Sequence, residues 1–94
     1  RLLPSAIELH QNYPNPFNST TSIVFSIPPV GTRQDVSLRV YDVLGREIAV
    51  LVNERLLTGT YATTFNGTGL ASGVYFYRLS ATNFVQTRKL ILLR

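Results

Sequence analysis

Short runs in which apolar and polar residues alternate, separated by turns, make up most of the sequence. The clearest run covers residues 36–42, where the aliphatic residues Val36, Leu38 and Val40 occupy every second position. Successive side chains of an extended chain point to opposite sides, so a period of two places these three residues on one face. The run therefore predicts a half-buried antiparallel strand.

Six further segments show strand signals of the same kind. Residues 46–57 also fit a helical spacing, but β-branched residues dominate them and strands flank them, so we predict a strand over residues 47–52. About seven short strands with turn signals between them predict an all-β fold, an antiparallel β-sandwich of the immunoglobulin or fibronectin type III kind. The other predicted strands cover residues 6–9, 20–27, 59–65, 73–81 and 84–93.

The segment at residues 70–79 carries the strongest strand signal. A turn at Ser72 and Gly73 leads into a run of β-branched, aromatic and aliphatic residues. We predict that this run is the central strand of the sandwich, with the flanking runs as its neighbours. Tyr75 stands two residues after Gly73, where a tyrosine at a sandwich corner bonds through its hydroxyl group to the chain upstream.

Two prolines at alternate positions define the loop at residues 11–18. Pro14 and Pro16 exclude a helix, and they lack the amide hydrogen that a β-ladder requires. Residues that precede proline are restricted to extended geometry, so we expect a stiff, ordered loop. We predict that Tyr13 and Phe17 pin this loop to the edge of the core.

Composition narrows the functions open to the chain. Its 94 residues suit one domain over residues 1–94, and 45% hydrophobic residues can fill one core. The net charge of +4 comes from basic residues spread along the sequence, which argues against nucleic-acid binding. No apolar stretch is long enough to span a bilayer. Because the chain begins with Arg1 rather than Met, we expect it to be a piece of a longer protein.

Candidate reactive residues are few and scattered. The chain has no cysteine, which excludes disulfides and thiolate metal sites. Its one histidine, His10, lacks the combination of acid, nucleophile or second ligand that catalysis or metal binding requires. We therefore expect no enzyme activity, no metal and no cofactor. Asp42 is expected to bond the backbone of its own turn, with a role as calcium ligand as the weaker alternative.

The aromatic residues allow two interpretations. A row of exposed tyrosines is typical of a carbohydrate-binding module, and the aromatic residues that could stack on sugars are Tyr13, Phe17, Tyr61, Tyr75, Phe76 and Tyr77. These residues lie at core-like spacing on predicted strands, so a place in the core is favoured.

The end of the chain is not fully explained by a core. Residues 90–93 are apolar at every position, whereas a strand with one wet face needs apolar residues only at every second position. Either both faces are covered, or one apolar face is left for a partner. Arg88, Lys89 and Arg94 flank the run and would limit edge-to-edge aggregation. The last strand is therefore the candidate recognition site.

Five segments, in this order and spacing, carry a family resemblance. Together they closely resemble the type A C-terminal sorting domain of the type IX secretion system of Bacteroidetes and related phyla. The match extends over residues 9–94. The same segments are also similar to the immunoglobulin-like domain of flagellar hook-capping proteins. The segments are residues 12–18 (NYPNPFN), 40–47 (VYDVLGRE), 59–61 (GTY), 70–79 (LASGVYFYRL) and 87–93 (TRKLILL).

The resemblance implies that the chain is the C-terminal sorting signal of a larger secreted protein. The outer-membrane translocon would recognise the folded domain after export to the periplasm. A sortase-type surface peptidase would then remove it as the cargo reaches the cell surface or the medium. The alternative is an accessory β-sandwich, a spacer or carbohydrate-binding module, of an extracellular multidomain enzyme. The residues implied for partner recognition are Gly73, Tyr75, Lys89, Leu90, Ile91, Leu92 and Leu93.

Overall fold

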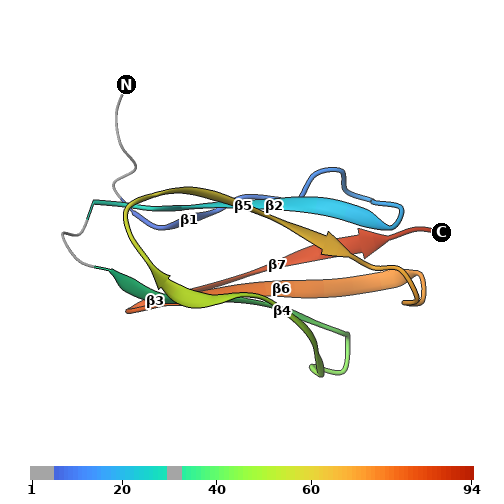
Figure 1. Ribbon diagram of the computed structural model, residues 1–94. Helices are drawn as coiled ribbons and strands as arrows, with labels where there is room; N and C mark the ends of the chain where they lie inside the picture. Colours follow the sequence, from blue (N-terminus) through green and yellow to red (C-terminus); the bar gives the residue numbers. More distant parts are fainter. Residues whose placement is uncertain (1–5, 30–32) are drawn as a thin grey trace.

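Two stacked β-sheets form the structure (Figure 1). The computed structural model describes residues 6–29 and 33–94, and within them the chain forms strands and no helix. The strands are β1 (Glu8–Leu9), β2 (Thr20–Ile27), β3 (Gln34–Tyr41), β4 (Glu47–Leu56), β5 (Gly59–Asn66), β6 (Gly73–Ala81) and β7 (Phe84–Leu92). One sheet has the order β1-β2-β5 and the other the order β4-β3-β6-β7, with antiparallel pairing between neighbouring strands. The predicted all-β sandwich is therefore confirmed.

Most predicted strand boundaries agree with the structure. β2 and β6 cover the predicted residues, and β3, β5 and β7 differ by no more than two residues at either end. β1 is shorter than predicted, and β4 continues to Leu56 instead of ending at residue 52. The second half of β4 is missed because residues 53–55 of this edge strand are polar and exposed, so hydrophobic alternation does not mark them.

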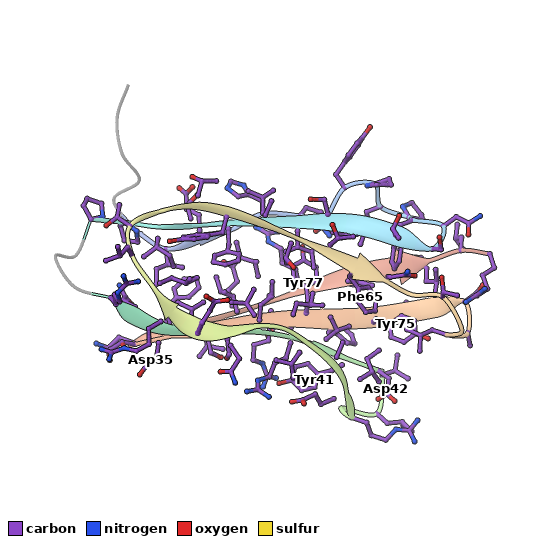
Figure 2. The ribbon with its side chains drawn as sticks, in the orientation of Figure 1. Asp35, Tyr41, Asp42, Phe65, Tyr75 and Tyr77 are labelled. Atoms are coloured by element: carbon purple, nitrogen blue, oxygen red, sulfur yellow. The ribbon has the colours of Figure 1, made fainter. Side chains whose placement is uncertain are left out.

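The core lies between the two sheets. Val36, Leu38 and Val40 of β3 are at most 2% exposed, as their alternation predicted. β6 lies between β3 and β7, so its interior position and its pairing with the following strand are confirmed. The preceding strand, β5, is not its neighbour as predicted, because β5 joins the other sheet. Figure 2 shows Tyr77 and Phe65 between the layers. The alternate residues of each strand are thus left to the outer faces of the sandwich.

A tight turn around Asp42 joins β3 to β4. Asp42 Oδ1 accepts hydrogen bonds from the N–H groups of Leu44 and Arg46, both at 2.9 Å, which confirms that Asp42 bonds its own turn. The Arg46 amide, and after it the Arg46 guanidinium at 2.8 Å from Oδ2, lower the pKa of Asp42 from its ordinary value of 3.8. Gly45, at a φ of 84°, takes the left-handed conformation that the turn requires.

Candidate recognition site

The closing strand β7 has one buried and one outward face. Leu90 and Leu92 are fully buried in the core. Lys89 and Ile91 point to the other side, where Lys89 is exposed and Ile91 is partly exposed. Leu93, directly after the strand, is 53% exposed. The apolar run at the end of the chain therefore supplies the core with alternate residues and leaves the others accessible.

Gly73 and Tyr75 support β7 from within the sheet. They pair with Leu92 and Leu90 across the β6–β7 ladder. The Tyr75 side chain is buried, and its hydroxyl group donates a hydrogen bond to Ala71 O at 2.7 Å. This bond confirms the predicted contact with the chain upstream. Both residues thus shape the start of β6 rather than the surface.

Residues 11–17, here called the strap, run along the outer edge of β7. The Phe17 N–H donates to Ile91 O at 2.9 Å, and the Leu93 N–H donates to Phe17 O at 3.0 Å. These two bonds form a parallel bridge between Phe17 and Leu92. The strap therefore adds a short parallel partner to an edge that the sheet itself leaves open.

Two side chains of the strap extend this cover. The Ile91 N–H donates to Asn15 Oδ1 at 3.0 Å, and Gln11 Nε2 donates to Lys89 O at 2.8 Å. The outer main-chain groups of β7 are thus occupied from the Lys89 carbonyl to the Leu93 amide. Covering an edge in this way protects it from pairing with a strand of another molecule.

Phe17 anchors the strap, whereas Tyr13 does not. Phe17 is 1% exposed and meets Phe65 edge-on, with ring centroids 6.0 Å apart. Tyr13 is 80% exposed, so the prediction that its side chain pins the loop is wrong. The backbone of Tyr13 bonds Ser22, and the preceding side chain, Asn12, is buried. Because neighbouring side chains of an extended chain alternate, Tyr13 points to solvent.

The hydroxyl group of Tyr77 ties the strap to the centre of the sandwich. Tyr77 is fully buried, and its hydroxyl group accepts from the Asn12 N–H at 2.9 Å and donates to His10 O at 2.7 Å. Burial raises the pKa of this phenol above its ordinary value of 10.0, against opposing effects of the Asn12 amide and Arg88. Sequence reasoning missed this anchor, because alternation marks Tyr77 only as one more inward residue.

Arg94 holds the end of the chain against the loop between β5 and β6. Its N–H donates to Ser72 Oγ at 3.0 Å, and its guanidinium donates to Leu70 O at 2.6 Å and to Gly67 O at 3.0 Å. The sequence marked Arg94 only as a flanking charge, and no pattern indicates these carbonyl partners. The tail is therefore held both along its edge and at its end.

One family of known domains matches nearly the whole chain. The match is to the family described as "Secretion system C-terminal sorting domain" and covers residues 11–93. The chain belongs to this family. The sorting domain is the C-terminal signal for type IX secretion, and it marks proteins for export to the cell surface or the medium. The resemblance carried by the five sequence segments is thus confirmed.

The fold of the sorting domain also occurs in a solved structure. It is similar to the crystal structure of dimeric latent PorU from Porphyromonas gingivalis, with a TM-score of 0.71 and 17% sequence identity. The match covers 98% of this chain and 10% of the PorU chain, so at this identity it shows the fold of one part of a much longer protein. A comparison with curated proteins finds no similar sequence.

The candidate reactive residue His10 has an acidic neighbour in the sorting domain. His10 Nε2 lies 3.7 Å from Glu8 Oε1, and both side chains are about half exposed. Across residues 6–29 and 33–94, no three His, Cys, Asp or Glu side chains gather as a metal site would require. In the part of the chain that the structure describes, no helix is long and apolar enough to cross a membrane.

Of the six aromatic residues expected in the core, Tyr13 and Phe76 lie outside it, Tyr13 exposed and Phe76 partly exposed. Tyr75 and Tyr77 are buried. Tyr61 stacks on Phe25 with ring centroids 5.5 Å apart, and its hydroxyl group donates to Leu57 O at 2.8 Å. These three rings therefore do not form the exposed, coplanar row that a carbohydrate-binding surface presents.

Proposed function

We propose that the secretion machinery recognises the folded sorting domain through the outward side of its tail. The accessible side chains Lys89, Ile91 and Leu93 make the contact. The observation that supports this proposal is the alternation within residues 90–93. Leu90 and Leu92 fill the core, whereas Ile91 and Leu93 remain accessible to a partner. The residues that hold the tail in shape from inside are Gly73, Tyr75, Leu90 and Leu92.

The strap bears on how such a contact forms. A partner that adds a strand to a sheet edge needs free main-chain N–H and C=O groups. The strap and its side chains occupy these groups from the Lys89 carbonyl to the Leu93 amide. Recognition of this part of the tail therefore uses side chains, unless the strap is first displaced.

The proposed partners are the outer-membrane translocon and a sortase-type surface peptidase. The domain acts as the C-terminal part of a larger cargo protein, and it works by recognition rather than by catalysis. Membership of the sorting-domain family supports this assignment. A fold of this kind also forms 10% of a much longer chain in the PorU structure.

A secreted reporter tests the proposed function. Residues 1–94 are fused to the C-terminus of a reporter that is sent to the periplasm of a bacterium with a type IX system. We expect the reporter in the medium or on the cell surface, and we expect it to stay in the periplasm in a strain without the translocon. A folded fusion that is retained in the wild-type strain would contradict the proposal.

Variants of the outward tail residues test the assigned surface. The double variant Ile91→Thr/Leu93→Ser removes accessible apolar side chains and keeps the buried leucines. Val85→Thr is the matched control, because Val85 is 66% exposed and lies on the same strand away from the tail. We expect export to fall about tenfold or more in the double variant, a loss of about 1.4 kcal/mol in binding, and to stay unchanged in the control. Equal export of all three proteins would exclude the outward tail as the recognition surface.

A further inference from the structure

The outer face of the four-stranded sheet, which points away from the core, carries an ordered set of side chains. The register pairs Tyr41 with Phe76 and Phe76 with Lys89, so these three residues form one row across β3, β6 and β7. Val74 and Ile91 form the next outward pair toward the C-terminal tail. Arg78 lies two residues beyond Phe76 on the opposite side of the row. We call this set the outer patch, and its residues are Tyr41, Val74, Phe76, Arg78, Lys89 and Ile91.

The outer patch is more apolar than a solvent-facing sheet surface usually is. The open face of an antiparallel sheet normally carries polar residues at alternate positions. Here Val74, Phe76, Ile91 and the Tyr41 ring stand on that face, and none of them packs against the core. No strand of the described residues covers the patch, and Figure 2 shows Tyr41 pointing away from the other sheet. All four side chains are partly exposed, and an accessible apolar group of this kind is typical of a contact surface.

Basic side chains adjoin these apolar side chains, and the acidic residue Glu47 lies opposite Tyr41 at the β4 end of the row. Arg39 and Arg78 are directly opposite each other, an arrangement of like charges that destabilises a strand pair. Arg39 is paired with Glu47 at 2.9 Å, whereas the Arg78 guanidinium lies 5.0 Å from the centre of the Tyr41 ring. Among the described residues, no carboxylate forms an ion pair with Arg78 or Lys89. The patch therefore offers two cations that an acidic partner can neutralise.

We propose that the outer patch docks an acidic, partly apolar segment of a partner protein. Its carboxylates meet Arg78 and Lys89, and its apolar side chains lie on Phe76, Val74 and Ile91. This proposal rests on the proposed function and extends it, because the tail residues Lys89 and Ile91 belong to the patch. It adds Arg78 and Phe76, residues of β6 outside the tail, to the surface that the machinery contacts.

The geometry favours a protein segment over an anionic glycan. Sugars stack on free aromatic faces, and one face of the Tyr41 ring, which stands next to Phe76 in the row, is already occupied by the Arg78 guanidinium. Arg78 and Lys89 are diagonal neighbours on adjacent strands, a relation in which residues are typically about 7–8 Å apart and their Cβ atoms somewhat closer. Alternate side chains of an extended peptide are about 6.6 Å apart, so two successive outward carboxylates of such a peptide match this spacing.

Chemical-shift mapping on the isotope-labelled 94-residue chain tests the proposal. The probe is a soluble extended peptide in which Glu alternates with Leu or Val, and a peptide with Gln in place of Glu is its control. We expect the amide signals of Phe76, Arg78 and Lys89 to shift with the acidic peptide. Raising the salt from about 0.05 M to about 0.5 M weakens this binding, because screening shortens the reach of surface charges.

Charge-matched variants assign the effect to the patch. Arg78→Gln is expected to weaken peptide binding about threefold, equal to about 0.65 kcal/mol, and Arg33→Gln, which removes the same charge from the loop before β3, leaves it unchanged. Both arginines are exposed, so neither change is expected to unfold the domain. Binding of both peptides alike, equal effects of the two variants, or binding of oligogalacturonate alone would overturn the proposal.

The reporter fusion separates this inference from the proposed function. Export of the wild-type fusion together with reduced export of Arg78→Gln supports the outer patch as a contact for the machinery. Normal export of Arg78→Gln, with no peptide bound to the patch, overturns this inference alone. Failure of the wild-type fusion to leave the periplasm overturns the proposed function, whatever the peptide does.

Discussion

Three tyrosines donate their hydroxyl hydrogen to a main-chain carbonyl group, and replacement of each by phenylalanine gives a graded test of burial. The three distances are 2.7 or 2.8 Å. Tyr77 is fully buried, Tyr75 is 8% exposed and Tyr61 is more exposed. The Tyr77 hydroxyl group alone among them also accepts a hydrogen bond, from the buried Asn12 N–H.

The expected costs follow from the number of bonds and from access to water. Tyr77→Phe leaves two main-chain groups, the Asn12 amide and the His10 carbonyl, without their partner. At about 1 kcal/mol for each net hydrogen bond, this change should lower the free energy of unfolding by about 2 kcal/mol. Tyr75→Phe removes one bond and should cost about 1 kcal/mol. Tyr61→Phe should cost about 0.5 kcal/mol or less, because water can replace the lost partner.

Urea unfolding followed by far-ultraviolet circular dichroism measures these differences. With a slope of about 1 kcal/mol per molar urea, the midpoint should fall by about 2 M for Tyr77→Phe and by about 1 M for Tyr75→Phe. Equal slopes in all variants would show that the transition itself is unchanged. A loss in Tyr61→Phe as large as that in Tyr77→Phe would refute the reasoning, because burial would then not set the cost.

Alkaline pH gives a second readout for the same side chain. Burial raises the pKa of Tyr77 in the folded state, so the unfolded chain releases this proton first, near the ordinary value of 10.0. The contribution of Tyr77 to stability is therefore complete below pH 10.0 and is lost as the pH rises through the raised folded-state value. The stability difference between wild type and Tyr77→Phe should narrow above pH 10.0, and a constant difference would contradict this assignment.

Two further changes test the anchoring of the strap and the turn before β4. Phe17→Ala should cost about 3–5 kcal/mol in urea unfolding, whereas Tyr13→Ala should change stability by less than about 0.5 kcal/mol, and similar losses would show that the strap is not held by Phe17. The pKa of Asp42 is lowered on folding, so its contribution is present above the ordinary value of 3.8 and is lost as the pH falls through the lower folded-state value. Unfolding experiments should therefore find that the gap between wild type and Asp42→Asn narrows below pH 3.8, and a gap that widens there would exclude this role.

Strand positions could be predicted where one face is buried. Alternation identified β3 from Val36, Leu38 and Val40, and it identified β2 and β6 with their observed ends. It failed in the second half of β4, because an exposed edge strand needs no apolar face. The family could also be recognised from the sequence, because its turn and strand segments keep their order along the chain.

Contacts between distant residues could not be predicted from these patterns. The tail was marked as a candidate site by residues 90–93, but its division into buried and outward residues depends on the sheet that it joins. The bonds of Asn15 and Gln11 to β7 link a loop to a strand more than seventy residues later, and they depend on the path of the folded backbone. Tyr13 was wrongly placed because aromatic character alone does not show to which side an extended residue points.

The parallel bridge between Phe17 and Leu92 also determines how the domain bears mechanical load. The two segments run in the same direction, and β1 and the end of β7 lie toward opposite ends of the molecule (Figure 1). Tension applied between β1 and the tail therefore slides the two segments past each other and strains their bonds together. When the chain is pulled by its last residues, the two hydrogen bonds of this bridge are loaded together in shear and do not break one after the other.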